Sequence, residues 1–324
     1  MATPLLEIKN LQIGFDAPAG LLMAVRGIDL EIYPGEIVAL VGESGCGKSL
    51  TAMSILNLID SPARIIAGEV LFKGENIFTM KPERLMAFRG CEASLIFQEP
   101  MTSLNPVFTI GDQICEVLIT HGNHTKANAR DKTISLLSMV GIPDPASRID
   151  RYPFELSGGM RQRAMIAMAL AMSPALLIAD EPTTALDVTI QLQILDLIKT
   201  LSKSGDDSKK MSVLLITHDI GIVSMIADRT AIMYAGEIME YGITEKVLKM
   251  KKHPYTQGLL NSIPPKFVKG KKKKRLSPIS GSVPELNEIP AGCVFRNRCP
   301  SYTQECGSDI SLKKIDDHYY RCIL

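Results

Sequence analysis

The sequence predicts an α/β protein, and three observations support that class. Residues 36–41 form a short apolar run rich in β-branched residues, followed by a glycine-rich loop and by helical apolar spacing over 50–58. Residues 175–179 and 213–216 are two further apolar runs of strand length, as expected of strands buried on both faces. Residues 5–33 alternate apolar and polar positions about a turn at 16–20, which predicts antiparallel strands.

Composition narrows the class of protein. The chain has 324 residues, of which 46% are hydrophobic, enough for one large domain and a smaller part. Lys and Arg number 36 against 35 Asp and Glu, so no charge excess argues for a nucleic-acid or acidic partner. The first residues lack a signal-peptide pattern, and Ser173-Pro174 interrupts the longest apolar run. We therefore expect a cytoplasmic protein whose membrane association comes through partners.

Residues 42–49 read Gly-Glu-Ser-Gly-Cys-Gly-Lys-Ser, the spacing of a phosphate-binding P-loop. Glycines let the backbone wrap an oxyanion, and N–H groups at the start of the next helix point towards it. Lys48 is expected to reach the β- and γ-phosphates, and the Ser49 hydroxyl to bind Mg²⁺. A glycine-rich turn that matches by chance is the alternative. The residues expected to hold the nucleotide here are Gly42, Ser44, Gly45, Cys46, Gly47, Lys48, Ser49 and Leu50.

Two residues at predicted strand ends are candidates to extend this site. Phe15 precedes the turn at 16–20 and is a candidate to stack on an adenine ring, with a buried sheet aromatic as the alternative. The apolar run at 93–97 leads to Gln98, where a Gln facing the P-loop can bind Mg²⁺ and hold an attacking water. An ordinary loop glutamine is the alternative there. Residues 68–74 read as a hairpin strand.

Helices separated by polar stretches are expected over 109–150, and residues 156–163 predict a second phosphate-binding helix start. They read Leu-Ser-Gly-Gly-Met-Arg-Gln-Arg, in which Ser157 is a candidate N-cap and the two glycines expose backbone N–H groups. The alternative is a simple glycine-capped turn.

The apolar run at 175–179 ends on two carboxylates. Asp180 fits the role of holding the Mg²⁺ water shell, and Glu181 that of polarising the attacking water, with a chance strand exit as the alternative. Asp187 is expected to cap the next helix. His218 ends the last apolar run, where it is a candidate to contact the γ-phosphate, although a lone His is usually structural.

These signals together resemble the motif series of ATP-binding cassette (ABC) ATPases over about residues 5–250. The six signals, in chain order, are the P-loop, Gln98, the 156–160 segment, Asp180-Glu181, Asp187 and His218. The resemblance implies a P-loop, RecA-like core with an antiparallel β subdomain and a helical subdomain at about 99–165. It also implies an ATPase in which two cassettes close head to tail over ATP. The second subunit would contribute Ser157, Gly158, Gly159, Met160 and Asp187 to the nucleotide contacts.

The narrower likeness is to the ATPase subunits of bacterial dipeptide and oligopeptide importers, of the D type. Residues 156–163 take the form LSGGMRQR, although Met160 stands where the signature usually has Gln. Residues 97–106 resemble the Q-loop of that family, and His253-Pro254-Tyr255-Thr256 opens its C-terminal extension. The likeness divides the chain into a nucleotide-binding domain at 1–250 and an extension at 251–324.

A transport motor is the function that this resemblance implies. ATP binding would close two cassettes, hydrolysis would open them, and the movement would pass to two membrane permease subunits beside residues 98–106. We expect a peripheral protein on the cytoplasmic face of the cell membrane, served indirectly by an extracellular peptide-binding protein. A sister ATPase is the expected partner, with a homodimer as the alternative. The rival function is a soluble ABC ATPase acting on nucleic acid or ribosomes, but one P-loop and no sustained heptads argue against that partner.

The composition shifts from about residue 264, where Pro264-Pro265 and the basic run 269–275 begin. A solvated linker is favoured there over a nucleic-acid or lipid site, because no aromatic residues interleave. Cys46, Cys91 and Cys115 are scattered and are expected to be small core or loop residues.

The other cysteines, Cys293, Cys299, Cys306 and Cys322, follow the spacing C-x5-C-x6-C-x15-C. Residues 276–324 are too few to bury a core unaided, so a cross-link or metal is expected. A reducing compartment disfavours disulfides, and zinc usually takes cysteines two to four residues apart. Four spread thiolates suit a [4Fe–4S] cluster, as in similar tails of some peptide-importer ATPases. Nothing in the sequence places the tail near the ATP site, so a structural role is expected, with a redox or regulatory role as the alternative.

Overall fold

The computed structural model describes residues 3–18, 20–98, 103–183, 187–204, 210–262 and 279–324. The chain divides into two compact units, neither of them continuous in sequence. The P-loop unit comprises Leu6–Glu31, Val38–Phe78 and Thr217–Leu324, and the helical unit comprises Met1–Leu5, Ile32–Ile37 and Thr79–Ile216. The predicted boundary at residue 250 and the predicted helical subdomain at about 99–165 stay predictions. Residues 99–102 of the predicted Q-loop, and the prolines and basic run at 264–275, lie outside the described residues.

The first sheet of the P-loop unit confirms the antiparallel strands predicted near the N-terminus. Its strands are β1 (Leu6–Ala17), β2 (Gly20–Ile32), β4 (Ala63–Phe72) and β5 (Glu75–Asn76), in the order β2-β1-β4-β5. Strand β4 starts earlier than the hairpin pattern at 68–74 predicts, because it pairs with β1 along most of its length. Leu6 lies opposite Phe72, and Phe15 opposite Ala63.

The second group of strands in this unit carries the P-loop. Strand β3 is parallel to β9, which is antiparallel to β10, and the short tail strands β12 and β11 continue the order. The strands are β3 (Ile37–Val41), β9 (Arg229–Tyr234), β10 (Glu237–Ile243), β11 (Lys313–Ile315) and β12 (His318–Tyr320). The helices are α1 (Lys48–Ile55), α9 (Ile220–Ile226), α10 (Thr244–Met250) and α11 (Pro254–Asn261), with 3₁₀ turns at Ile77–Thr79, Arg296–Arg298 and Gln304–Gly307.

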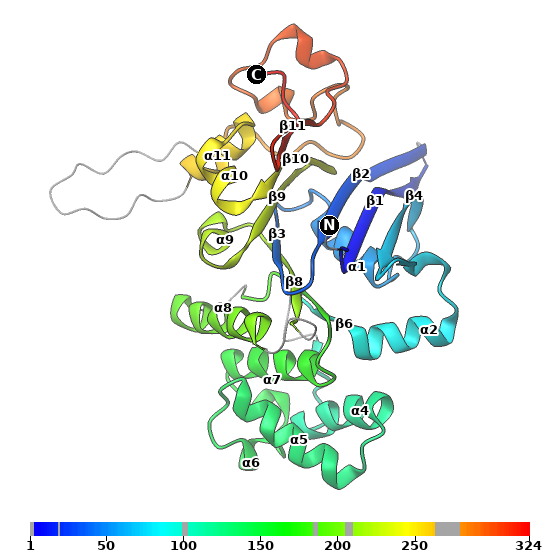
Figure 1. The fold of residues 1–324 in the computed structure, drawn as a ribbon, viewed down its shortest axis with the longest axis vertical. Coiled ribbons are helices and arrows are strands. Elements are labelled where there is room, and N and C mark those ends of the chain that lie inside the picture. The colour runs from blue at the N-terminus through cyan, green and yellow to red at the C-terminus, as the bar shows by residue number, and fades with distance from the viewer. Residues whose placement is uncertain (1–2, 19, 99–102, 184–186, 205–209, 263–278) are drawn as a thin grey trace, which may run out of the picture. The chain divides into compact units, whose positions relative to one another are not determined.

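The helical unit combines short parallel strands with a cluster of helices (Figure 1). Strand β7 is parallel to both β6 and β8, and every residue of β7 and β8 is buried, which explains their apolar runs. The strands are β6 (Ala93–Ile96), β7 (Leu176–Asp180) and β8 (Ser212–Thr217). The helices are α2 (Pro82–Ala87), α4 (Ile110–Gly122), α5 (Lys126–Met139), α6 (Pro145–Arg148), α7 (Gly158–Leu170) and α8 (Val188–Lys203), with a π-helical turn at Phe88–Glu92 and a 3₁₀ turn at Pro153–Glu155.

Local chemistry accounts for where these helices begin and end. Thr109 and Thr125 cap α4 and α5, since each side chain accepts an N–H from the first turn of its helix. Helix α1 ends at Ile55, earlier than the predicted 58, because Leu56 is its C-cap and Asn57 is left-handed with φ 51°.

The C-terminal tail does not form a core of its own. Val294 and Phe295 are buried in the same hydrophobic cluster as Val41, Ile232 and Tyr255 of the P-loop unit. Residues 276–324 thus bury no core unaided, as predicted, but they pack on the rest of the P-loop unit, so a cross-link or metal does not follow from their small size. The neighbouring strands supply the apolar surface that so short a segment lacks.

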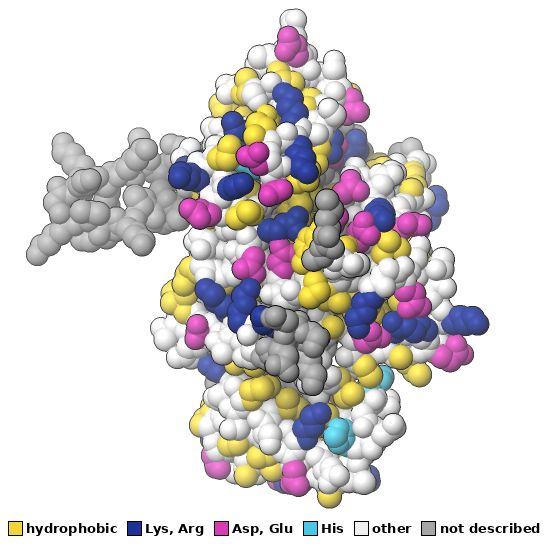
Figure 2. Space-filling model, viewed as in Figure 1, with side chains coloured by type: hydrophobic (Ala, Val, Ile, Leu, Met, Phe, Trp, Pro, Cys, Tyr) yellow, Lys and Arg dark blue, Asp and Glu magenta, His cyan; other side chains and the backbone are white. Residues whose placement is uncertain are grey.

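The charges on the surface and the apolar content of the helices are as the composition predicts. Acidic and basic side chains are interspersed on the face seen in Figure 2. Among the described helices, none has the length and apolar composition that a membrane crossing requires.

Candidate phosphate-binding and hydrolytic residues

The P-loop follows the carboxyl end of β3, a strand buried at all five positions. Gly47 is the N-cap of α1 and has φ 103°, a conformation that L side chains rarely adopt. At Gly42 a Cβ atom would lie 2.2 Å from the carbonyl oxygen of Met233, so only glycine fits. These two positions explain why the loop needs glycine where the sequence has it.

Lys48 is folded against the loop rather than extended into solvent. Its Nζ donates to the carbonyl oxygens of Gly42 at 2.8 Å and Glu43 at 2.9 Å, and the residue is 5% exposed. Burial raises the pKa of the neighbouring Cys46 thiol, which Lys48 only partly offsets, so Cys46 is a neutral packed thiol. The loop therefore presents one ordered cation, held by backbone oxygens.

The other predicted residues of this unit lie as follows. Ser44 and Gly45 are exposed at the loop tip, and Ser49 is half-buried in the first turn of α1. Phe15 is half-buried near the end of β1, and His218 is exposed directly after Thr217. The roles of these residues in nucleotide binding stay predictions.

In the helical unit, Gln98 and Glu181 meet. Gln98 Nε2 donates to Glu181 Oε2 at 3.2 Å. The contact arises because β6 and β7 are parallel neighbours, so their carboxyl ends share one edge of the sheet. Asp180, the last residue of β7, is 8% exposed, which leaves its carboxylate largely shielded from water. Thus three residues singled out in the sequence lie at one sheet edge.

Glu181 has an uncommon backbone conformation. Its φ of 44° lies in the left-handed region, and its backbone N–H donates to the carbonyl oxygen of Ile216 at 3.0 Å. Such conformations cost roughly 1–3 kcal/mol in a non-glycine residue and cluster at functional sites. The backbone bond and the Gln98 amide together hold the carboxylate in one place.

The predicted caps of α7 and α8 are confirmed. Ser157 Oγ accepts the N–H of Met160 at 3.4 Å, and Asp187 Oδ1 accepts that of Ile190 at 3.0 Å. A Cβ on Gly159 would lie 3.2 Å from Ile190 Cγ2, so the two helix starts are neighbours. A Cβ on Gly158 would meet no atom within 4 Å, which leaves that backbone open to a ligand.

Sequence reasoning missed a buried glutamine that links α7 to the carboxylates. Gln162 is 1% exposed, and its Nε2 donates to the carbonyl oxygen of Pro182, the residue after Glu181. Gln162 lies within the LSGGMRQR segment, and that position is the feature of the sequence that could have indicated its role. Gln162 thereby ties the helix that starts at Gly158 to the end of β7.

The tail cysteines are free thiols, three of them buried and Cys299 half-buried. Burial, with smaller contributions from the nearby Cys306, Cys299 and Cys322, raises the pKa of Cys293 to about 11. The four thiols therefore interact electrostatically, and all four are soft ligands. Among the described residues, however, no group of three or more His, Cys, Asp or Glu side chains is arranged to hold a metal ion.

Comparisons with known proteins assign the family. The family model "ABC transporter" matches residues 25–184, and "Oligopeptide/dipeptide transporter, C-terminal region" matches residues 239–306. The dipeptide transport ATP-binding protein DppD of Bacillus subtilis is 46% identical over 98% of this chain and 94% of its own length. The chain belongs to the ABC transporter family, as an ATP-binding protein. The oligopeptide transport ATP-binding protein OppD of the same organism is 45% identical over 98% of this chain and 88% of its own.

Solved ABC structures agree with this assignment. The ATP-binding cassette MJ0796, in a dimeric post-hydrolysis state with ADP and Pi, matches with a TM-score of 0.66 and 26% identity. The match covers 74% of this chain and 98% of that one. The predicted fold class, an ABC ATPase cassette, is confirmed, and ATP hydrolysis is the activity of this ABC protein.

Proposed function

We propose that this chain is the ATP-hydrolysing motor subunit of a dipeptide or oligopeptide importer, peripheral on the cytoplasmic face of the cell membrane. The observation that carries the proposal is similarity to peptide-transport ATP-binding proteins across 98% of the chain, through the C-terminal extension. Other ABC ATPases share the cassette, so the extension is the more specific part of the match.

ATP is the proposed ligand of the P-loop, with Lys48 at the β- and γ-phosphates. The proposed Mg²⁺ ligands are Ser49, Gln98 and Asp180, and their hydroxyl, amide and carboxylate oxygens are the hard donors that this cation takes. Bound Mg²⁺ would supply charge neutralisation on the phosphates. Phe15 is proposed to stack on the adenine ring.

Glu181 is the proposed group that polarises the attacking water. The hydrogen bond from Gln98 supports this role, because it orients the Glu181 carboxylate at the edge of the sheet where the strands end. His218 is proposed to contact the γ-phosphate. In a head-to-tail dimer, the 156–160 segment and Asp187 would complete the nucleotide site of the other subunit.

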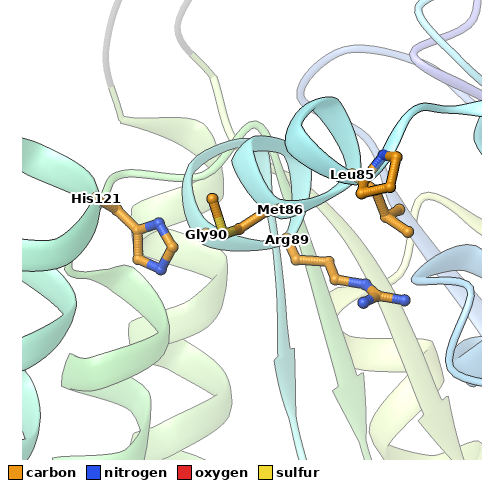
Figure 3. A pocket seen from close by; sticks show the side chains of 6 residues that line it. Leu85, Met86, Arg89, Gly90 and His121 are labelled. Carbon is orange, nitrogen blue, oxygen red and sulfur yellow. The ribbon is translucent and has the colours of Figure 1, made fainter.

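A surface of the helical unit suits the permease partners. Met86, Arg89 and His121, labelled in Figure 3, line a hollow of about 350 Å³. A second hollow, of about 460 Å³, is lined by residues that include His121 and Phe108. Val107 is 71% exposed and Met86 62%, and exposed apolar side chains beside hollows favour a protein partner. We propose that the two permease subunits dock here, next to Gln98.

A sister ATPase is the proposed second cassette, with an external peptide-binding protein acting indirectly and no nucleic acid. For the tail, we propose a [4Fe–4S] cluster on Cys293, Cys299, Cys306 and Cys322. Two observations support it: all four thiols are free and at least half-buried, and the Cys293 N–H donates to the Cys306 carbonyl oxygen. Zinc usually takes cysteines two to four residues apart, whereas a cluster spreads its irons over separate corners and takes ligands from several directions, so the spacing of these cysteines favours the cluster.

Reconstitution tests the motor function directly. The chain would be co-expressed with candidate permease and sister-ATPase subunits from the same organism, and the complex placed in vesicles. We expect co-purification, and ATP hydrolysis that rises when peptide and its binding protein are added outside. Stimulation by DNA or ribosomes, with no retention of permease subunits, would contradict the proposal.

A further inference from the structure

The Cys-rich tail reaches the phosphate-binding loop through one side chain. Arg298 stands next to Cys299, and its Nη1 donates to both carboxylate oxygens of Glu43, each at 3.0 Å. Glu43 is the residue after Gly42 in the P-loop. The Arg298 side chain is 6% exposed and that of Glu43 29%, so the pair is largely shielded from water. Shielding strengthens a charge-assisted hydrogen bond.

Glu43 is held at three points, and one of them is the P-loop lysine. Its backbone N–H donates to the hydroxyl of Tyr255 at 3.1 Å, and its carbonyl oxygen accepts from Lys48 Nζ at 2.9 Å. Its carboxylate accepts from Arg298. Tyr255 and Arg298 both come from the region after residue 250. The residue that holds the Lys48 ammonium is thus positioned by two side chains of the C-terminal region.

Contacts other than its pair with Glu43 also hold the Arg298 side chain in place. Its Nε donates to the carbonyl oxygen of Ser280 at 2.9 Å, and its Nη2 to that of Gly281 at 3.2 Å. Its Nη1 also contacts the Tyr234 hydroxyl at 3.3 Å, and its guanidinium lies 5.6 Å from the centre of that ring. A guanidinium oriented by other bonds loses little side-chain freedom when it pairs with a carboxylate.

We propose that Arg298 is a positioning residue for ATP binding, through which the Cys-rich tail holds Glu43 and Lys48 in place. The proposal rests on the P-loop binding ATP, as put forward above. Arg298 acts in two ways: it fixes the Glu43 backbone that receives Lys48, and it neutralises a carboxylate beside the triphosphate. Nothing in the sequence places the tail near the ATP site, whereas the structure brings Arg298 of the tail against Glu43 of the P-loop.

The tail thiols lie close to this contact along the chain. Arg298 belongs to a short 3₁₀ turn between Cys293 and Cys299, and its N–H donates to the carbonyl oxygen of Phe295. The Cys293 N–H donates to the Cys306 carbonyl oxygen at 2.9 Å. Any change that displaces these thiols would therefore displace Arg298 and act on the P-loop.

The test measures the affinity of the full-length chain for a fluorescent ATP analogue with Mg²⁺. Arg298→Gln should raise Kd about tenfold, equivalent to about 1.4 kcal/mol, because it removes the charge-assisted hydrogen bond that holds Glu43 in place. The matched control is Arg296→Gln in the same turn, whose Nη1 donates to Ala291 and not to the P-loop. The control should change Kd by less than about twofold.

A double-mutant cycle with Glu43→Gln separates this contact from general damage to the tail. In the Glu43→Gln background, Arg298→Gln should change Kd by less than about twofold, since the carboxylate charge with which Arg298 pairs is already gone. Arg298→Lys keeps the charge and should raise Kd only about threefold. If Arg298→Gln is unstable, Arg298→Lys is compared in the two Glu43 backgrounds in its place.

Two results would overturn the inference while leaving the proposed function intact. One is an Arg298→Gln affinity equal to that of the Arg296→Gln control. The other is an equal loss in both Glu43 backgrounds. Lys48→Ala serves as the separate check: if that variant binds the analogue as well as the wild type, the proposed P-loop function itself fails.

Discussion

Acidification should destabilise this protein through His253, the N-cap of α11. His253 Nδ1 accepts the backbone N–H of Tyr255 at 3.0 Å, and the residue is 1% exposed. Burial lowers the pKa of His253 from 6.5 to about 3. A protonated ring would lose the Nδ1 acceptor, and Tyr255 is the residue whose hydroxyl receives the Glu43 N–H. The stability of this cap is therefore linked to pH.

The direction and size of the change in stability follow from the difference in proton binding between the native and the unfolded chain. Above pH 6.5 the ring is neutral in both states, so the native state carries no penalty. As the pH falls from 6.5 towards 3, the unfolded chain binds a proton that the native chain excludes, and stability declines. At about pH 5 the free energy of unfolding is lower by roughly 2 kcal/mol, because each pH unit below the pKa of the unfolded chain costs about 1.36 kcal/mol.

The assay is urea unfolding at about pH 7.5 and about pH 5, comparing the wild type with His253→Asn. Asparagine is a good N-cap and does not titrate, so it keeps the acceptor and removes the linkage. The difference between the free energies of unfolding of the two proteins should shift by about 2 kcal/mol in favour of the variant at the lower pH. Other titrating groups cancel in this difference. A gap that stays constant across the pH range would refute the reasoning.

Three further predictions concern activity and metal content. Glu181→Gln should bind ATP normally yet lower the turnover rate by about 10²–10³, as measured by phosphate release, because it removes the water-polarising carboxylate; near wild-type turnover would exclude that role. Substitution of Ser103 and Asn105 should spare nucleotide binding but uncouple hydrolysis from peptide uptake in reconstituted vesicles, and normal uptake would contradict the docking assignment. Anaerobically purified protein should be brown, absorb near 400 nm and contain about four irons per chain. Colourless protein with stoichiometric zinc would replace the cluster with a zinc site.

The local parts of the site could be predicted from the sequence because their causes are local. The glycine at position 47 is required by a single backbone conformation, and Ser157 and Asp187 cap helices through bonds to residues three positions away. The apolar runs ending on Asp180 and His218 follow from burial of whole strands. Periodicity and side-chain chemistry over a few residues determine such features, so they can be predicted without knowledge of the tertiary structure.

Some of the fold needed pairing information that no short segment contains. The early start of β4 depends on its register with β1, in which Phe15 lies opposite Ala63. The hydrogen bond from Gln98 to Glu181 depends on β6 and β7 being parallel neighbours. The sequence indicated a role for each residue, but not their contact, because strand order is a long-range property.

The tail shows most clearly what only the tertiary structure decided. By itself, the sequence determined that four cysteines crowd the C-terminal region, and it suggested a segment unable to bury a core. The structure packs Phe295 into the cluster beneath the P-loop and pairs Arg298 with Glu43, 255 residues away in the chain. Neither partner has a local signature, because an arginine and a glutamate are ordinary surface residues until folding removes the water around them.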